Sequence, residues 1–359
     1  MRGEELRAAA EPVGPAEVLL PCSELAPTLE FFTGLGFRVE TIFPAEDPEV
    51  ASLSGYGLRL RLEPGDGAPG RIRIGARRYD ALGAKPVTAP NGTAIEFVDP
   101  DPPFVMPPFQ PEFVITRREG GPAEGQGRAG MTYRDLIPSR LGGRYIASHI
   151  SIPEGGPVSD WAHYHKIGFQ MIFVRRGWVR VAYEDQGPEF VMEAHDCVLQ
   201  PPRIRHRVLE SSPGFEVVEI GCPALHETLA DPEMVLPTGR HLPDRDFGGQ
   251  RFLRHIARET PWRPVDGGFE AQVTGMYEAT GGIARVRVLR PAGADAAEME
   301  PHDGELLFGF LLEGSATLDC RGRQALGPAD AFVIPPGEPW GLRDCTRDLS
   351  LLEVRTYQD

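Results

Sequence analysis

The sequence predicts a mainly β protein in which two antiparallel barrels of the jelly-roll kind follow a small α+β domain. From about residue 132 onward, short alternating or β-branched runs are separated by turn residues, which is the pattern of such barrels. This region also contains an internal repeat, because FVRRGWVRVAY aligns with FLLEGSATLDC and CVLQPPRIRH aligns with FVIPPGEPWG. The 42 glycines and 36 prolines favour many turns over long helices.

Composition and repeat together divide the 359 residues into six segments. We expect an N-terminal tail over 1–14, an α+β domain over 15–100, a Pro- and Gly-rich linker over 101–131, a first barrel over 132–230, a polar connector over 231–265 and a second barrel over 266–359.

Bulk properties limit the partners. The net charge of −15 argues against nucleic acid or an anionic membrane. The five cysteines are widely spaced without a CxxC pair, which suits reduced thiols better than a disulfide framework. The N-terminus lacks the apolar segment of a signal peptide, and no run approaches about 18 uninterrupted apolar residues. We therefore expect a soluble, cytoplasmic protein with a small-molecule substrate.

The expected α+β domain has the element order βαβββ. A strand leads to Ser23, a residue type that favours the N-cap, and Leu25, Leu29 and Phe32 follow at helical spacing. A glycine-containing stop ends this helix, and VASLSGYGLRLRLEPG then alternates as a hairpin.

This order and the stretch FFTGLGF resemble the vicinal-oxygen-chelate (glyoxalase/bleomycin-resistance) family, and APNGTAIEFVDPD resembles its closing strand. The resemblance implies metal ligands at the start of the first strand and on the last strand, where Glu17 and Glu96 stand. Two alternatives stay open: a second metal site, or two surface carboxylates. No second amphipathic helix fits between RIRIGARRYD and NGTAIEF, so the second half of that fold is expected to be truncated. A second copy of the chain could cover the resulting edge in a homodimer.

The candidate metal site lies in the first barrel. His163 and His165 share a face of one strand because strand side chains alternate with period two. Gln170 lies an odd number of positions further, so a turn or bulge must intervene. His206 follows a Pro-Pro turn and can return on a neighbouring strand. Three imidazoles and an amide are a plausible ligand set for a borderline divalent metal.

That spacing resembles the two motifs of the cupin family. The matching positions are His163, His165, Gln170 and Gly177 in the first motif and Asp196, Pro202 and His206 in the second, in which both glycines are replaced, one of them by Arg203. The resemblance implies a two-barrel cupin whose first barrel holds one divalent ion, Fe(II) foremost, with Mn, Ni or Zn as alternatives. Many cupin oxygenases carry Glu where this chain has Gln170, and a neutral amide leaves the metal more positive.

The second barrel is expected to have lost its metal. Transferring the ligand positions by the repeat offset gives Glu300, His302, Leu307 and Trp340. Of these, His302 is a good ligand and Glu300 an acceptable one, whereas Leu307 and Trp340 cannot ligate. We expect His302 to be hydrogen-bonded or solvent-facing, and the barrel to pack against the first.

The favoured function is an Fe(II)-dependent dioxygenase acting on a small oxygenated aromatic or enolisable carbonyl compound. Tyr183 is the candidate proton donor, because it falls on a strand that could reach the barrel mouth. A metal-dependent isomerase or lyase acting on a sugar- or uronate-like substrate is the alternative that Gln170 favours. A non-enzymatic small-molecule-binding protein is the third, and the absence of a helix-turn-helix or a basic patch disfavours a DNA-binding regulator.

Overall fold

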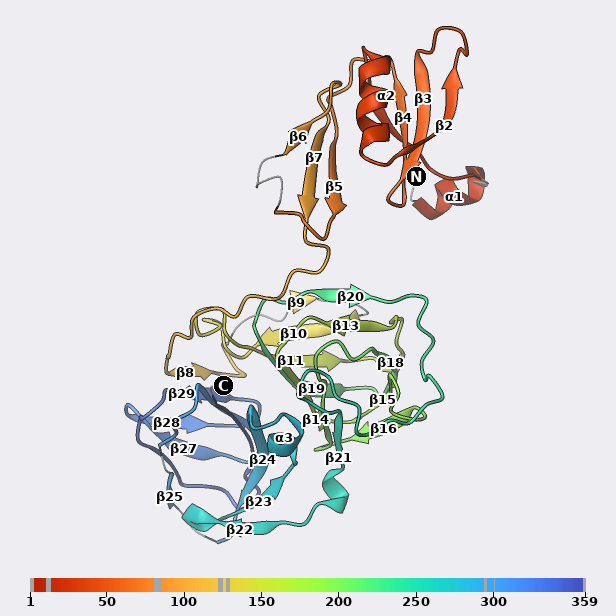
Figure 1. Ribbon diagram of the computed structural model, residues 1–359. Coiled ribbons are helices and arrows are strands. Elements are labelled where there is room, and N and C mark those ends of the chain that lie inside the picture. Colours follow the sequence, from red (N-terminus) through yellow and green to blue (C-terminus); the bar gives the residue numbers. More distant parts are fainter. Residues whose placement is uncertain are drawn as a thin grey trace. The chain divides into compact units, whose positions relative to one another are not determined.

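The computed structural model describes residues 3–10, 14–80, 86–121, 125–126, 130–293, 296–299 and 301–357 (Figure 1). The chain divides into two compact units, Met1–Pro102 and Pro103–Asp359. Glu300, one of the second-barrel positions considered above, lies outside the described residues. Among the described helices, none combines the length and the apolar character that a membrane crossing requires.

The N-terminal unit contains the expected βαβββ order. Its elements are α1 (Gly3–Ala10), β1 (Val18–Pro21), α2 (Leu25–Gly34), β2 (Arg38–Phe43), β3 (Val50–Gly55), β4 (Leu58–Glu63), β5 (Arg71–Gly75), β6 (Val87–Thr88) and β7 (Ala94–Val98). One sheet has the order β1-β4-β3-β2, with β1 parallel to β4, and a second has the order β5-β7-β6. Buried Phe32 of α2 packs in the same core as Leu60 of β4 and Ile95 of β7.

The start of α2 differs from the expectation. The N-cap residue is Glu24 rather than Ser23, and no side chain caps this end of the helix. Oγ1 of Thr28, within the first turn, donates back to the Glu24 carbonyl at 2.8 Å, which leaves the free amides of this helix end without a side-chain acceptor. The short helix α1 lies within the segment that was expected to be an N-terminal tail.

The first barrel consists of two facing antiparallel sheets. Its strands are β9 (Gly125–Gln126), β10 (Thr132–Asp135), β11 (Ile146–Ile152), β12 (Gly156–Pro157), β13 (His163–His165), β14 (Phe169–Arg176), β15 (Trp178–Tyr183), β16 (Phe190–Glu193), β17 (Cys197–Leu199), β18 (His206–Ser211), β19 (Phe215–Cys222), β20 (Thr228–Ala230) and β21 (Leu253–His255). One sheet has the order β21-β17-β14-β19-β11-β10-β9 and the other β16-β15-β18-β13-β20, with β12 paired to β18.

The second barrel repeats this design. Its elements are β8 (Val114–Thr116), β22 (Arg263–Val265), β23 (Phe269–Val273), α3 (Met276–Ala279), β24 (Ala284–Pro291), β25 (Ala296–Met299), β26 (Leu306–Glu313), β27 (Ala316–Asp319), β28 (Arg323–Leu326), β29 (Ala331–Ile334), β30 (Trp340–Arg343) and β31 (Ser350–Thr356), with 3₁₀ turns at Ala257–Glu259 and Asp266–Gly268. The sheets have the orders β22-β23-β24-β31-β26-β29-β8 and β25-β30-β27-β28.

Two segments expected to be non-regular contribute strands. Within the expected linker, β8 pairs with β29 of the second barrel, and Oγ1 of its buried Thr116 donates to the Leu136 carbonyl at 2.9 Å. Within the expected connector, β21 extends the first barrel through β17 and β22 joins the second barrel. Strands of three residues between prolines carry too little periodicity to be visible in sequence, and distant pairing partners supply their hydrogen bonds.

The interior of the second barrel is mainly apolar. Leu307 and Trp340, at two of the transferred ligand positions, are buried among Leu318, Phe332 and other hydrophobic side chains. His302 is buried too, and its Nε2 lies 2.7 Å from the Ile334 carbonyl, so the ring is a hydrogen-bonded core residue. A further core joins the two barrels. Its members include Phe169, Met171, Phe173 and Val218 of the first barrel and Val286, Phe308, Phe310 and Leu352 of the second.

Candidate metal centre

Strands β13 and β18 bring three histidines together. His163 is the register partner of His206, and both are buried. The ring centroid of His163 lies 4.3 Å from that of His206 and 5.3 Å from that of His165. One potential ligand nitrogen of each ring lies within 4.8 Å of the other two. Within the described part of the chain, this is the only such convergence of three or more His, Cys, Asp or Glu side chains.

Hydrogen bonds to neighbouring backbone carbonyls determine which nitrogen carries the proton in two of these rings. Nδ1 of His163 lies 2.9 Å from the Trp161 carbonyl, and Nδ1 of His206 lies 3.0 Å from the Ile204 carbonyl. A carbonyl only accepts, so both Nδ1 atoms carry the proton and Nε2 is the nitrogen that would bind a cation. Nδ1 of His165 lies 3.0 Å from Oγ1 of Thr228, which permits the same arrangement. The donor set therefore fits a divalent metal.

The turn before His206 corrects the alignment of the second motif. His195 and Arg203 have φ angles of 72° and 64°, in the left-handed region that favours glycine. If the first glycine of the motif is assigned to His195 instead of Asp196, the proline of the motif falls at Pro201 instead of Pro202. The second glycine of the motif then falls at Arg203, and its histidine falls at His206. His195 is thus the turn residue that replaces the first glycine. Asp196 stabilises this turn, since its Oδ2 accepts from the Glu193 amide at 3.0 Å.

Gln170 lies in the wall of the same cavity as the three histidines. The chain passes from β13 to β14 in the opposing sheet before this residue, which supplies the change of direction that its odd spacing requires. Gln170 is buried, and its Nε2 donates to Oε1 of Glu219 at 2.5 Å. The role of the Gln170 amide as a metal ligand stays a prediction.

Glu219 was missed by sequence reasoning. It lies on β19, and the alternation of FEVVEIG places it on the same face as Phe215 and Val217, both buried. A carboxylate that alternates in phase with the apolar residues of the inward face is the signal that could have identified it. His226, which also lines the cavity, was likewise missed. Its Nδ1 lies 3.0 Å from the Pro223 carbonyl, and its ring centroid lies 5.3 Å from that of His165.

Tyr183, the predicted proton donor, is buried in the cavity wall beside the histidines. Its Oη accepts a hydrogen bond from Nε2 of Gln200 at 2.7 Å. Burial raises the pKa of the Tyr183 phenol well above its ordinary value, so the hydroxyl keeps its proton at neutral pH. Its catalytic role stays a prediction.

The cavity has a volume of about 250 Å³ and is polar at one end. The register of the paired strands explains this change from polar to apolar side chains along the cavity. Along β15 the inward residues run from Tyr183 to Val181 and Val179, and along β19 from Glu219 to Val217. The polar end therefore carries the histidines, and the opposite end is lined mainly by aliphatic side chains, with Tyr133 and Phe215 among them. The aliphatic side chains include Ile150, Ile152, Ile172, Val179, Val181, Met192, Val208 and Val217.

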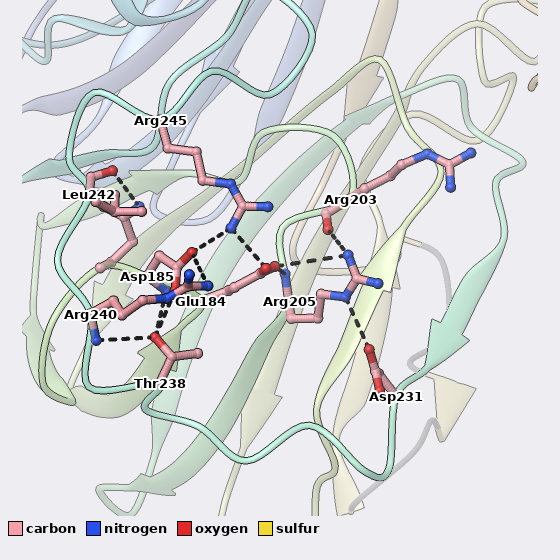
Figure 2. Close-up of polar contacts among 10 residues, drawn as sticks. Glu184, Asp185, Arg203, Arg205, Asp231, Thr238, Arg240, Leu242 and Arg245 are labelled. Atoms are coloured by element: carbon pink, nitrogen blue, oxygen red, sulfur yellow. Dashed lines mark hydrogen bonds and ion pairs between the residues drawn. The ribbon is translucent and has the colours of Figure 1, made fainter.

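A charged network lies directly after Tyr183 and supports the segment that leads to His206 (Figure 2). Arg240 forms two hydrogen bonds of 2.8 Å with buried Asp185, and Nη1 of Arg245 contacts Glu184 at 2.8 Å and Asp185 at 2.7 Å. Oε2 of Glu184 accepts from the Arg205 amide at 3.2 Å. Burial opposes ionisation of Asp185, but hydrogen bonds from Thr238 and the arginines hold its pKa below the ordinary value. The network joins the 238–245 segment to the residue preceding the His206 ligand position.

Neither Glu17 nor Glu96 belongs to a group of three or more converging His, Cys, Asp or Glu side chains among the described residues. Glu17 lies 3.8 Å from a guanidinium nitrogen of Arg59, and Glu96 forms ion pairs with Arg71 and Arg73. These contacts favour the surface-carboxylate alternative.

Comparison with known proteins places the fold. No family model matches the sequence, and no curated protein matches it. Salicylate 1,2-dioxygenase from Pseudaminobacter salicylatoxidans superposes with a TM-score of 0.52 at 16% identity, covering 70% of this chain and 86% of that one. A glyoxylate-induced protein from Pseudomonas aeruginosa gives 0.52 at 11% identity, covering 72% and 94%. Oxalate decarboxylase from Bacillus subtilis gives 0.50 at 11%, covering 66% and 75%.

At these identities the similarity shows the fold alone. It confirms the predicted fold class, a mainly β chain with two cupin barrels. The vicinal-oxygen-chelate resemblance of the N-terminal unit stays a prediction.

Proposed function

We propose that this chain is a mononuclear metal-dependent cupin enzyme, and specifically a non-haem Fe(II) dioxygenase acting on a small oxygenated aromatic or enolisable carbonyl compound. One observation carries the proposal: three convergent histidines lie at the polar end of a cavity whose opposite end is aliphatic. Such a cavity would hold an oxygenated head near the metal and a hydrocarbon part away from it. Among the similar folds are a salicylate 1,2-dioxygenase and an oxalate decarboxylase with Mn(II) centres, which supports metal chemistry in general.

Nε2 of His163, His165 and His206 and the amide oxygen of Gln170 would hold the metal. The bound ion would polarise an oxygen of the substrate and, as iron(II), supply the dioxygen chemistry. The chain's own residues orient and protect the substrate: the aliphatic wall contacts its hydrocarbon part and excludes water, and Tyr183 holds a proton at Oη beside the polar end.

The cavity also bears on the size and polarity of the substrate. Its volume of about 250 Å³ lies below the roughly 300–1,000 Å³ of pockets for drug-sized ligands, which suits a compound with a single ring or a short chain. A sugar or uronate would place several of its hydroxyl groups against the aliphatic part of the wall, where few hydrogen-bond partners are available. The lining therefore favours the less polar substrate class, and Gln170 is the residue that favours the isomerase or lyase alternative.

Oxygen dependence tests the proposal. Reconstituted protein should consume dioxygen with at least one member of a panel of diketones, catechols and hydroxyaromatic acids, and turnover should stop under strict anaerobiosis. Product formed at the same rate without dioxygen would favour the isomerase or lyase. Tight binding of a panel compound that is recovered unchanged, with and without dioxygen, would favour a binding protein.

A further inference from the structure

Glu219 is a carboxylate that the cupin ligand pattern does not contain, and it contacts the one atypical member of that pattern. Nε2 of Gln170 lies 2.5 Å from Oε1 of Glu219, and both residues line the cavity of the histidines. On the ladder between β14 and β19, Gln170 is opposite Gly221 and Glu219 is opposite Ile172. The two side chains therefore meet diagonally across this ladder.

This contact fixes which end of the Gln170 amide faces which way. A carboxylate accepts hydrogen bonds and cannot donate them, whereas an amide has a donor nitrogen and an acceptor oxygen. The nitrogen end must therefore face Glu219, and Oε1 is directed to the other side. Only the oxygen end of a neutral amide is a useful ligand for a divalent cation. Burial of Gln170 restricts the rotamers that could reverse this arrangement.

We propose that Glu219 is a positioning residue that holds the Gln170 amide with its oxygen toward the metal. The inference rests on the proposed function, because it requires a metal at the three histidines. Many cupins have a carboxylate as a direct metal ligand at the position of Gln170. In this chain the carboxylate would instead contact that ligand, from Glu219 on the neighbouring strand β19. Outer partners of this kind orient a ligand in the way that carboxylates orient metal-bound histidines.

Cobalt binding to the metal-stripped protein tests this role without any assay of activity. The measurements are the Co(II) dissociation constant by calorimetry and the visible absorption spectrum of the Co(II) protein. Glu219→Ala should weaken Co(II) binding by about ten-fold or more and change the spectrum, because the amide can then reverse. Glu219→Gln keeps an acceptor oxygen for Gln170 and should lose less. Glu193→Ala, an exposed carboxylate of β16 that does not line the cavity, is the matched control and should bind like wild type.

The double variant Gln170→Ala/Glu219→Ala decides whether Glu219 acts through Gln170. We expect it to bind Co(II) no more weakly than Gln170→Ala alone, since the second change has nothing left to position. Wild-type affinity in Glu219→Ala, or losses that add in the double variant, would overturn the inference while leaving the proposed function intact. Wild-type protein that takes up no Co(II) would overturn both. If Glu219→Ala does not fold, the same cycle with Glu219→Gln applies, and its loss must vanish in the Gln170→Ala background.

Discussion

Tyr183 and His206 are register partners on β15 and β18, and their rings stack with centroids 5.6 Å apart and planes inclined by 24°. The ladder therefore holds a protonated phenol against one of the three imidazoles that would bind the metal. Gln200 orients the phenol from the Pro-Pro turn side, at 2.7 Å. The predicted proton donor and one predicted ligand position are thus fixed by a single pair of strands.

Replacing Tyr183 with Phe should separate proton donation from metal binding. The ring keeps its stacking on His206, so we expect metal content to stay at the wild-type level. Turnover should fall by roughly 10²–10⁴-fold if the hydroxyl transfers a proton to or from the substrate. Steady-state kinetics and elemental analysis of the same preparation check both values. Unchanged turnover would remove Tyr183 from the mechanism.

Filling the aliphatic end of the cavity should impair the substrate and spare the metal. Val217 lies opposite Ile150 on the β11 and β19 ladder and lines this end. Val217→Phe should lower kcat/KM by about 100-fold, because the larger ring occupies space meant for the hydrocarbon part of the substrate. Metal content serves as the internal control. A variant with wild-type kcat/KM would show that the substrate does not enter this region.

Asp185 should be important for stability. Its buried carboxylate accepts hydrogen bonds from Arg240 and Arg245 and from the Thr238 hydroxyl, so Asp185→Ala leaves these donors without their acceptor. We expect the free energy of unfolding to fall by about 2 kcal/mol, measured by urea denaturation, because water can solvate the partly exposed arginines. Asp185→Asn is the matched control, because asparagine tolerates the residue's φ of 59° and keeps one acceptor oxygen. A larger loss in Asn than in Ala would contradict this account.

Acid should destabilise the chain through the pair His149 and Glu216. A guanidinium nitrogen of Arg134 lies 3.3 Å from Nδ1 of His149, whose Nε2 lies 2.8 Å from Glu216, so the ring is neutral. Burial lowers the pKa of His149 below its ordinary value of 6.5. The neutral ring therefore stabilises the fold above pH 6.5, and this stabilisation is lost as pH falls from 6.5 through the lowered pKa. Burial opposes ionisation of Glu216, yet His149 and Arg175 lower its pKa from 4.5 to about 2, so its contribution is lost between these values.

Chemical denaturation from pH 7 to pH 3 measures this effect. The free energy of unfolding should decrease as pH falls, and the decrease should be smaller in Glu216→Gln, which cannot be protonated. Equal pH dependence in wild type and variant would assign the acid sensitivity to other groups.

Much of the site could be predicted because its rules are local. The period-two alternation places His163 and His165 on one strand, and the proline turn returns His206 to the neighbouring strand. Glu219 could not be assigned a role, since its meeting with Gln170 depends on the register between β14 and β19, which no local pattern encodes. The first glycine and the proline of the second motif were each misplaced by one residue, because the left-handed turn residue that marks the motif's start, His195, is not a glycine.

The fold shows the same division between local and distant information. The barrels follow from repeated alternating runs, whereas β8 becomes a strand only because distant β29 pairs with it. The N-cap is Glu24 instead of the expected Ser23, and no side chain accepts a hydrogen bond from the free amides at this end of the helix.

Elemental analysis after reconstitution tests the central claim most directly. The account predicts about one equivalent of divalent metal per chain in the wild type and in His302→Ala, the matched histidine of the second barrel. In a triple variant with His163, His165 and His206 replaced by Ala, the metal content per chain should fall by about ten-fold or more. Wild-type protein that stays metal-free, or a triple variant that binds as much metal as the wild type, would contradict it.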